Sequence, residues 1–256
     1  MYEYIAKLYN TASEWEQLKE VPGTSDYPRA EITKKIFREY LASRRGKTDA
    51  LEIGPGSGFI TEHLSQVIPT DGRCSLDLMD FSAGFLSNTG KKKFNIRNYI
   101  CFDVTKYQSD ACFDQKYDFI LFQEVLEHCV SPFVALANIN NMLHDDGLLF
   151  LTIPNAGWWR NIYMENIRFK RFLIPKTYMD THLNEISTTG LIKLVTMAGF
   201  DVLRIEFYCS KYPILKSLSS EQVGFLLVKR DDPANRWVEL TNNLREQYQL
   251  LLSKKD

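Results

Sequence analysis

The sequence predicts an α/β fold in which a mostly parallel sheet of seven strands is covered by helices on both faces. The first observation behind this prediction is an alternation of short apolar runs with segments compatible with helices. The second is the length of 256 residues, which is enough to bury one large hydrophobic core. The third is a composition of 45% hydrophobic and 25% charged residues, which is typical of a globular chain.

Seven apolar runs account for the predicted strands, and each is bounded by glycine or by polar residues. In chain order they are residues 50–54, 73–82, 97–104, 117–125, 147–155, 201–210 and 223–230. Between the fifth and sixth runs, the segment STTGLIKLVTMAGF is predicted to form a helix that Ser187 caps and Gly199 ends.

Three segments lie outside this alternating plan. Residues 1–45 are expected to form a helical N-terminal cap on the α/β domain at 46–230. Within that domain, residues 155–186 are too long for an ordinary connection and are expected to build a lid over the substrate. Residues 231–256 are predicted to form a C-terminal helix, which either docks on its own domain or joins two copies in a homodimer. One face of that helix carries Trp237, Leu240, Leu244, Tyr248 and Leu251.

Charge and composition exclude several classes of protein. The 31 basic and 32 acidic residues give a net charge of −1, so nucleic acid is not an expected partner. No apolar run approaches the roughly 18 residues that span a bilayer, so no membrane association and a cytoplasmic location are expected. The five cysteines have no CxxC spacing, which indicates neither a zinc ribbon nor a disulfide framework.

The stretch LEIGPGSG combines an acid, Glu52, with glycines at 54, 56 and 58 directly after the first predicted strand. Gly54, Gly56 and Gly58 allow a tight turn and let the main chain approach a ligand closely. A dinucleotide fingerprint needs its third glycine one residue later, which argues against a nicotinamide dehydrogenase. Glu52 would repel a pyrophosphate and favours a ligand with a cationic amino-acid end, while a tight turn without a ligand is the alternative.

With the later motifs, this stretch resembles the class I S-adenosylmethionine-dependent methyltransferases from residue 47 to about residue 230. The resemblance implies a Rossmann-like sheet whose last strand is antiparallel, and S-adenosylmethionine as the cofactor. It implies that the glycine loop holds the methionine part of this cofactor. It also implies that Gln123, at the end of the fourth strand, lies near the sulfonium.

Two further motifs imply where the nucleoside part would bind. LMDFS resembles the end of the second strand, where Asp80 would accept both ribose hydroxyls next to Phe81, with Asp77 as the competing candidate. CFDVT is similar to the adenine-side motif, so Asp103 would bind the exocyclic amine and Val104 the ring.

The stretch EVLEHC follows the fourth strand and carries the candidate catalytic groups. Glu124, Glu127 and His128 stand at i, i+3 and i+4, so they are expected to share one helical face. Together with His182 they can bind a divalent metal such as magnesium, manganese or iron. This pattern resembles the metal-dependent O-methyltransferases, in which the cation binds substrate oxygens. Glu127 and His128 are the predicted catalytic residues. In the alternative without a metal, the glutamate caps a turn and His128 is the general base or a structural group.

The predicted lid interleaves aromatic and basic residues, which suit a planar or sugar group and a phosphate. They are Trp158, Trp159, Tyr163, Phe169, Phe172 and Tyr178 with Arg160, Arg168, Lys170 and Arg171. The expected acceptor is therefore a small molecule, such as a phosphorylated or nucleotide-linked sugar for surface-polysaccharide biosynthesis, methylated on a hydroxyl oxygen. The alternatives are N- or C-methylation of a secondary metabolite or quinone precursor without a metal, and a non-catalytic cofactor-binding partner subunit.

Overall fold

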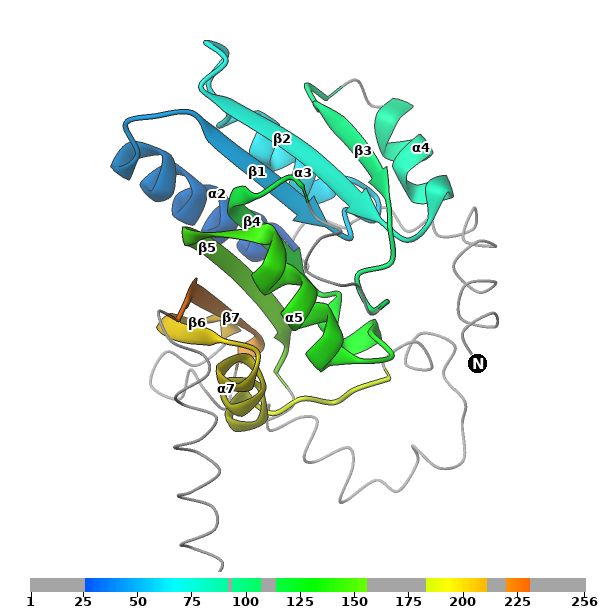
Figure 1. Ribbon diagram of the computed structural model, residues 1–256, viewed down its shortest axis with the longest axis vertical. Coiled ribbons are helices and arrows are strands. Elements are labelled where there is room, and N and C mark those ends of the chain that lie inside the picture. The colour runs from blue at the N-terminus through cyan, green and yellow to red at the C-terminus, as the bar shows by residue number, and fades with distance from the viewer. Residues whose placement is uncertain (1–25, 92–93, 107–113, 156–182, 211–219, 231–256) are drawn as a thin grey trace, which may run out of the picture.

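Seven strands form one sheet in the order β3-β2-β1-β4-β5-β7-β6 (Figure 1). The computed structural model describes residues 26–91, 94–106, 114–155, 183–210 and 220–230. The strands are β1 (Thr48–Ile53), β2 (Cys74–Asp80), β3 (Asn98–Cys101), β4 (Tyr117–Gln123), β5 (Leu143–Pro154), β6 (Phe200–Ser210) and β7 (Ser220–Lys229). β1 to β5 pair in parallel, and β7 runs antiparallel to both of its neighbours, β5 and β6. The predicted Rossmann-like sheet with an antiparallel last strand is confirmed.

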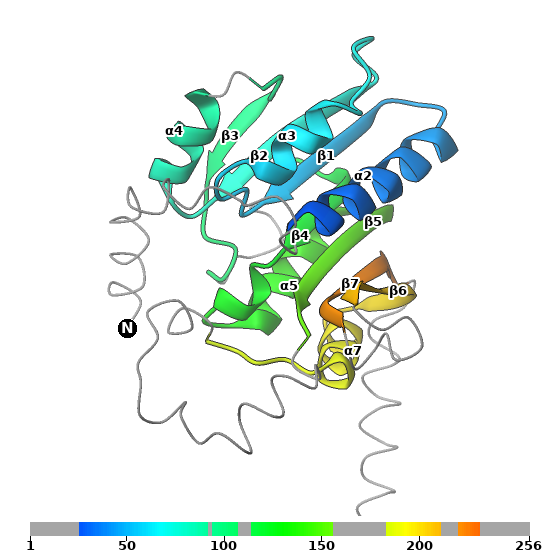
Figure 2. The same cartoon turned by 180° about the vertical axis from the view of Figure 1, so that it is seen from behind.

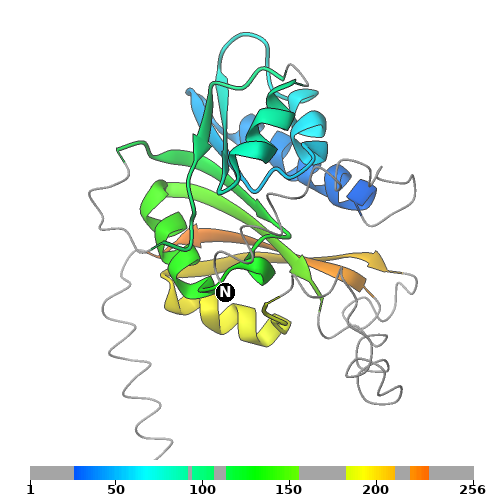
Figure 3. The same cartoon turned by 90° about the vertical axis from the view of Figure 1, so that its right-hand side faces the viewer.

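Helices cover both faces of the sheet, as Figure 1 and the reverse view in Figure 2 show. Helices α2 (Asp26–Ser43), α3 (Phe59–Ser65) and α4 (Ala83–Lys91) pack on one face, where their apolar residues join one buried cluster. Helices α5 (Pro132–Met142) and α7 (Thr188–Met197) pack on the other face with a second buried cluster. In Figure 3, α7 lies against the strands β6 and β7.

The central strand β4 shows why this sequence forms a sheet that is buried on both faces. Phe119 and Leu121 belong to the cluster under α2 and α3, whereas Ile120 and Phe122 belong to the cluster under α5 and α7. All four side chains are fully buried, so the strand has a continuous apolar sequence rather than an alternating one.

Local signals set the ends of the helices on the second face. The hydroxyl of Ser187 accepts a hydrogen bond of 3.1 Å from the main-chain N–H of Gly190 at the start of α7. Gly199 ends this region with a φ of 85°, which a side chain would disfavour. Both predictions for this helix are confirmed. Helix α5 begins at Pro132, where a missing N–H costs nothing.

Several sequence predictions concern parts of the chain outside the described residues. Of the predicted N-terminal cap, the structure describes residues 26–45, most of which form α2. Most of the predicted lid, including His182, and the whole C-terminal helix lie outside the described residues. Within the described part of the chain, no helix is both long and apolar enough to cross a membrane.

Candidate active site

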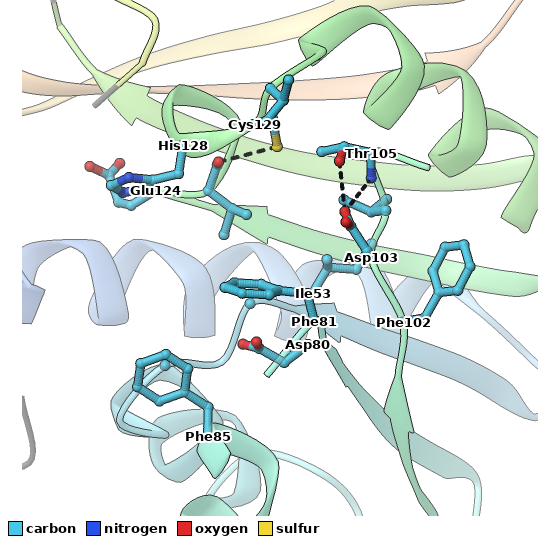
Figure 4. Close-up of a pocket in the computed structure, with 15 residues that line it drawn as sticks. Ile53, Asp80, Phe81, Phe85, Phe102, Asp103, Thr105, Glu124, His128 and Cys129 are labelled. Atoms are coloured by element: carbon cyan, nitrogen blue, oxygen red, sulfur yellow. Dashed lines mark hydrogen bonds between the residues drawn. The ribbon is translucent and has the colours of Figure 1, made fainter. Parts of the chain in front are cut away.

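A cavity of about 200 Å³ lies at the carboxyl ends of the first four strands (Figure 4). In an open α/β sheet, this edge is where ligands bind. The lining comes from four loops, one after each of β1, β2, β3 and β4. It consists of Ile53, Gly54, Gly56, Asp80, Phe81, Phe85, Phe102, Asp103, Val104, Thr105, Glu124, Val125, His128, Cys129 and Val130.

The glycine loop needs its glycines for conformation and for space. Gly54, Gly56 and Gly58 have φ angles of 72°, 53° and 78°, a region that other residues rarely adopt. A Cβ atom on Gly54 would lie 2.4 Å from Cγ2 of Val125, so the loop touches the turn after β4. A Cβ atom on Gly56 would meet nothing within 4 Å. Gly54 and Gly56 line the cavity, whereas Gly58 does not.

Glu52, the acid that precedes the glycines, does not line the cavity. Its side chain is buried, and Oε2 accepts a hydrogen bond of 2.7 Å from the hydroxyl of Thr61 in α3. Burial raises the pKa of Glu52 to about 7, against the opposing effects of the Thr61 hydrogen bond and the charge of Arg29. Glu52 therefore links β1 to α3, and its contact with a ligand stays a prediction.

The two acids of β2 lie in different surroundings. Asp80 lines the cavity, and its Oδ1 accepts a hydrogen bond of 2.8 Å from the main-chain N–H of Ser82. Burial raises the pKa of Asp80 to about 6, although the Ser82 N–H lowers it. Asp77 lies away from the cavity, where its carboxylate accepts hydrogen bonds from Arg97, Asn98 and Tyr117. The carboxylate of Asp77, the competing candidate for the ribose, is thus already bound by three side chains of the protein.

The loop after β3 presents a carboxylate oxygen for which the described residues supply no hydrogen-bond donor. Oδ1 of Asp103 accepts hydrogen bonds from the main-chain N–H of Thr105 at 2.9 Å and from its hydroxyl at 2.7 Å. Oδ2 of Asp103 is buried and has no hydrogen-bond partner among the described residues. Val104 is buried and also lines the cavity. A buried acceptor on a cavity wall indicates a donor on the ligand.

The turn after β4 differs from the sequence prediction. Glu124 has a φ of 54°, and only residues Leu126–His128 are helical, as a single turn of 3-10 helix named η3. The expected shared helical face of Glu124, Glu127 and His128 is therefore wrong. The N–H of Glu124 still pairs with the carbonyl of Thr152 in β5, and Cys129 is already extended before α5 begins. No room is left for an α-helical turn.

The predicted site residues at the end of β4 and in the turn after it separate into two that line the cavity and two that do not. Glu124 and His128 are on its wall, as Figure 4 shows. Glu127 is buried outside it, with Oε1 at 3.9 Å from Nε2 of His128. Burial and the charge of Glu124 raise the pKa of Glu127 well above its usual range. Gln123 faces α2 instead, where its amide donates a hydrogen bond of 2.8 Å to Thr33.

No metal cluster forms within the described part of the chain, because no three potential ligands converge there. His182 lies outside the described residues, so its predicted part in a metal site stays a prediction. The E-x-x-E-H spacing alone does not bring Glu124, Glu127 and His128 together as a set of ligands.

Sequence reasoning missed two asparagines that bind the main chain of these loops. Asn138 of α5 donates to the loop after β3, and Asn184 donates to the turn after β4. The signal for Asn138 was a polar residue on the apolar face of α5, next to the buried Ala135 and Ile139. For Asn184 the sequence held no comparable signal.

Comparisons with known sequences agree with the resemblance. A family model described as a methyltransferase domain matches residues 18–205. Ubiquinone biosynthesis O-methyltransferase of Coxiella burnetii is 26% identical over 224 residues, which cover 82% of this chain and 90% of that protein. A segment of the highly reducing polyketide synthase GPY1 of Gibberella fujikuroi is 33% identical over 141 residues. That segment covers 47% of this chain and only 6% of the synthase.

Solved structures share the fold at low sequence identity. The carbon methyltransferase CurJ superposes with a TM-score of 0.61 at 18% identity, covering 79% of this chain and 54% of that one. Magnesium protoporphyrin IX methyltransferase of Synechocystis PCC 6803, with bound SAH, superposes with a TM-score of 0.61 at 13% identity. The match covers 89% of this chain and 98% of that one. The fold is that of the S-adenosylmethionine-dependent methyltransferases.

Proposed function

Because the chain belongs to the methyltransferase domain family, we propose that it transfers a methyl group from S-adenosylmethionine to a hydroxyl oxygen of a small molecule. The observation that carries this proposal is the cavity at the carboxyl edge of the sheet. There, bare glycine main chain and two carboxylates come from the ends of β1, β2 and β3, and His128 comes from the turn after β4.

The cavity wall fits the three parts of the cofactor. Gly54 and Gly56 leave main chain free of side chains, which suits the methionine part. Asp80 offers carboxylate oxygens to the ribose diol. The buried Oδ2 of Asp103, which has no partner among the described residues, suits the exocyclic amine of adenine. Phe81 and Val104 add apolar surface for the ring.

The sulfonium of the cofactor supplies an activated methyl group, so the chain must align the acceptor and remove its proton. His128 is the group on the wall with the chemistry of a base near neutral pH. The imidazole of His128 would accept the proton of the acceptor hydroxyl, and the bound cofactor would supply the methyl group. Oε1 of Glu127 lies 3.9 Å from Nε2 of His128. Because burial raises the pKa of Glu127, its negative charge stabilises a protonated His128 only at a pH above that raised pKa.

The similarity to ubiquinone biosynthesis O-methyltransferase supports oxygen as the acceptor atom, because that match extends over most of both chains. Carbon is the second candidate for the acceptor atom. The CurJ carbon methyltransferase shares the fold, which therefore also accommodates a carbon acceptor.

Four finer hypotheses are kept as separate proposals. Metal assistance would involve Glu124, Glu127, His128 and His182, and its support is the E-x-x-E-H spacing alone. The phosphorylated or nucleotide-linked sugar, the homodimer and the cytoplasmic location are also supported by the sequence alone. Adding a chelator and then manganese tests the metal hypothesis without altering the chain.

One experiment tests the proposed reaction. The purified protein is titrated with S-adenosylhomocysteine by calorimetry and then incubated with methyl-¹³C-labelled S-adenosylmethionine. Catechol serves as the oxygen probe and an acetoacetyl thioester as the carbon probe. We expect binding heat and a ¹³C signal of an O-methyl group. A C-methyl signal would favour the second candidate, and the absence of binding heat would overturn both.

A further inference from the structure

Two asparagines each donate hydrogen bonds to the main-chain carbonyls before and after one residue of the cavity wall. Nδ2 of Asn138 donates hydrogen bonds to the carbonyls of Val104 at 2.8 Å and Lys106 at 2.7 Å. Asn184 donates its main-chain N–H to the carbonyl of Glu127 at 3.0 Å and its Nδ2 to the carbonyl of Cys129 at 2.7 Å. The first pair of carbonyls flanks Thr105, and the second pair flanks His128.

Asn138 acts on the wall that we assign to adenine. It is buried in α5, so its two donors are not exchanged for water. The loop that it holds includes Thr105, whose N–H and hydroxyl both bind Oδ1 of Asp103. The orientation of Asp103 therefore depends on Asn138. So does the direction of its Oδ2, for which the described residues supply no donor.

Asn184 acts on the wall that we assign to the acceptor. The 3-10 helix η3 is one turn long, so it has little stability of its own. The carbonyl of Glu127 accepts a second hydrogen bond, from the N–H of Leu183 at 2.8 Å. Residues 183 and 184 thus satisfy the two main-chain acceptors beside His128 and hold the main chain from which its side chain extends.

We propose that Asn138 and Asn184 are positioning residues that set the two halves of the site separately. Asn138 sets the adenine half through Thr105 and Asp103, and Asn184 sets the acceptor half through the main chain of η3. This inference rests on the proposed function, because it assigns adenine to one wall and proton removal to the other.

Leucine substitutions test the separation, since leucine has the same number and branching of side-chain heavy atoms as asparagine but no donor. Asn138→Leu removes two hydrogen bonds, whereas Asn184→Leu removes one and keeps the main-chain N–H. Asn140→Leu is the matched control, because that asparagine also lies in α5 but donates to the carbonyl of Gly199, away from the cavity. If a leucine variant does not fold, the serine variants at the same positions keep one donor and serve instead.

Cofactor binding and the state of His128 are measured independently of turnover. Calorimetry with S-adenosylhomocysteine reports the adenine half, and the imidazole NMR signals of His128 at fixed pH report the other half. We expect Asn138→Leu to weaken binding about tenfold and to leave the His128 signals in place. We expect Asn184→Leu to shift these signals and to change binding less than about twofold. Asn140→Leu should do neither.

Selectivity for the base separates positioning from a general loss of structure. The S-inosyl analogue of S-adenosylhomocysteine has a carbonyl in place of the exocyclic amine, so it cannot donate to Asp103. The preference for adenine should fall in Asn138→Leu alone. Equal changes in both asparagine variants, or changes no larger than in Asn140→Leu, would overturn the inference. A wild-type protein that binds no S-adenosylhomocysteine would instead overturn the proposed function on which it rests.

Discussion

The two walls of the cavity that we assign to the cofactor and to the acceptor are built in different ways. The cofactor wall consists of the ends of β1, β2 and β3 and the residues directly after them, each placed by its own strand. The acceptor wall consists of one short turn, in which Glu124 has a positive φ and residues 126–128 form the 3-10 helix η3. Residues 183 and 184, which are far away in the sequence, donate hydrogen bonds to the main chain of this helix. The first wall follows from the sheet, whereas the second depends on contacts between distant segments.

Removing the base should have the largest effect, and it should affect the acceptor wall alone. His128→Asn is expected to lower the rate of catechol methylation by about 10² to 10⁴. The affinity for S-adenosylhomocysteine should stay within about twofold, because His128 is not part of the cofactor wall. Steady-state kinetics and calorimetry measure the two quantities, and His144→Asn on the surface is the control. A large loss of cofactor affinity would contradict the division into two walls.

Gly54→Ala probes the point where the two walls touch. The added Cβ would lie 2.4 Å from Val125, and alanine disfavours a φ of 72°. We expect the free energy of unfolding to fall by about 3 kcal/mol and cofactor binding to be lost with it. Urea denaturation and calorimetry test both. Gly46→Ala, where a Cβ would meet nothing within 4 Å, should show neither change.

Asp80→Asn should weaken cofactor binding but stabilise the protein above pH 6. Losing one charge-assisted contact should cost about 1.5 to 3 kcal/mol in binding of S-adenosylhomocysteine. Burial raises the pKa of Asp80 to about 6, so its ionised form is less stable in the folded than in the unfolded chain. Protonated Asp80 therefore stabilises the folded protein at a pH below the pKa that Asp80 has in the unfolded chain. This stability is lost as the pH rises through about 6, the pKa of Asp80 in the folded chain.

The stability of Asp80→Asn should therefore exceed that of the wild type at pH 8, by on the order of 2 kcal/mol, and converge with it at pH 4. Thermal unfolding at both pH values measures this difference. Asp114→Asn, at an exposed position, is the control. An unchanged affinity for S-adenosylhomocysteine would remove Asp80 from the ribose site.

Thr61→Val should have the smallest effect and tests whether Glu52 is a structural link or a ligand contact. The Thr61 hydroxyl lowers the pKa of Glu52, which burial raises to about 7. Without this donor, the ionised form loses a partner, so stability should fall by about 1 kcal/mol at pH 8 and less at pH 5. Cofactor affinity should change little. Thr33→Val, another buried threonine, should lower stability without this dependence on pH.

The fold and the position of Gly54, Asp80 and Asp103 at the cavity were predictable because their signals are local. Each predicted strand is a contiguous apolar run, and Gly54, Asp80 and Asp103 are placed by the strand that they follow. Parallel strands bring their carboxyl ends to one edge, so motifs far apart in sequence meet without further information.

The acceptor wall was not predictable in the same way. The spacing of Glu124, Glu127 and His128 suggested an α-helical face, but Pro132 starts α5 too soon after the strand for such a turn to form. Gln123 was expected at the cavity, yet strand alternation places it on the α2 side with Phe119 and Leu121. Main-chain contacts such as those of Asn184 depend on the tertiary structure and produce no periodic pattern in the sequence.

Both ends of the connection between β5 and α7 are anchored in the described structure. Asn155 bonds to the main chain of Glu221 and Ser220 at the start of β7, and residues 183 and 184 bond to the carbonyl of Glu127. Because the entropic cost of a loop grows slowly with its length, the sequence between two fixed anchors can lengthen, shorten or diverge at little cost to the fold. We propose that such changes alter the acceptor, while the residues that line the cavity are kept.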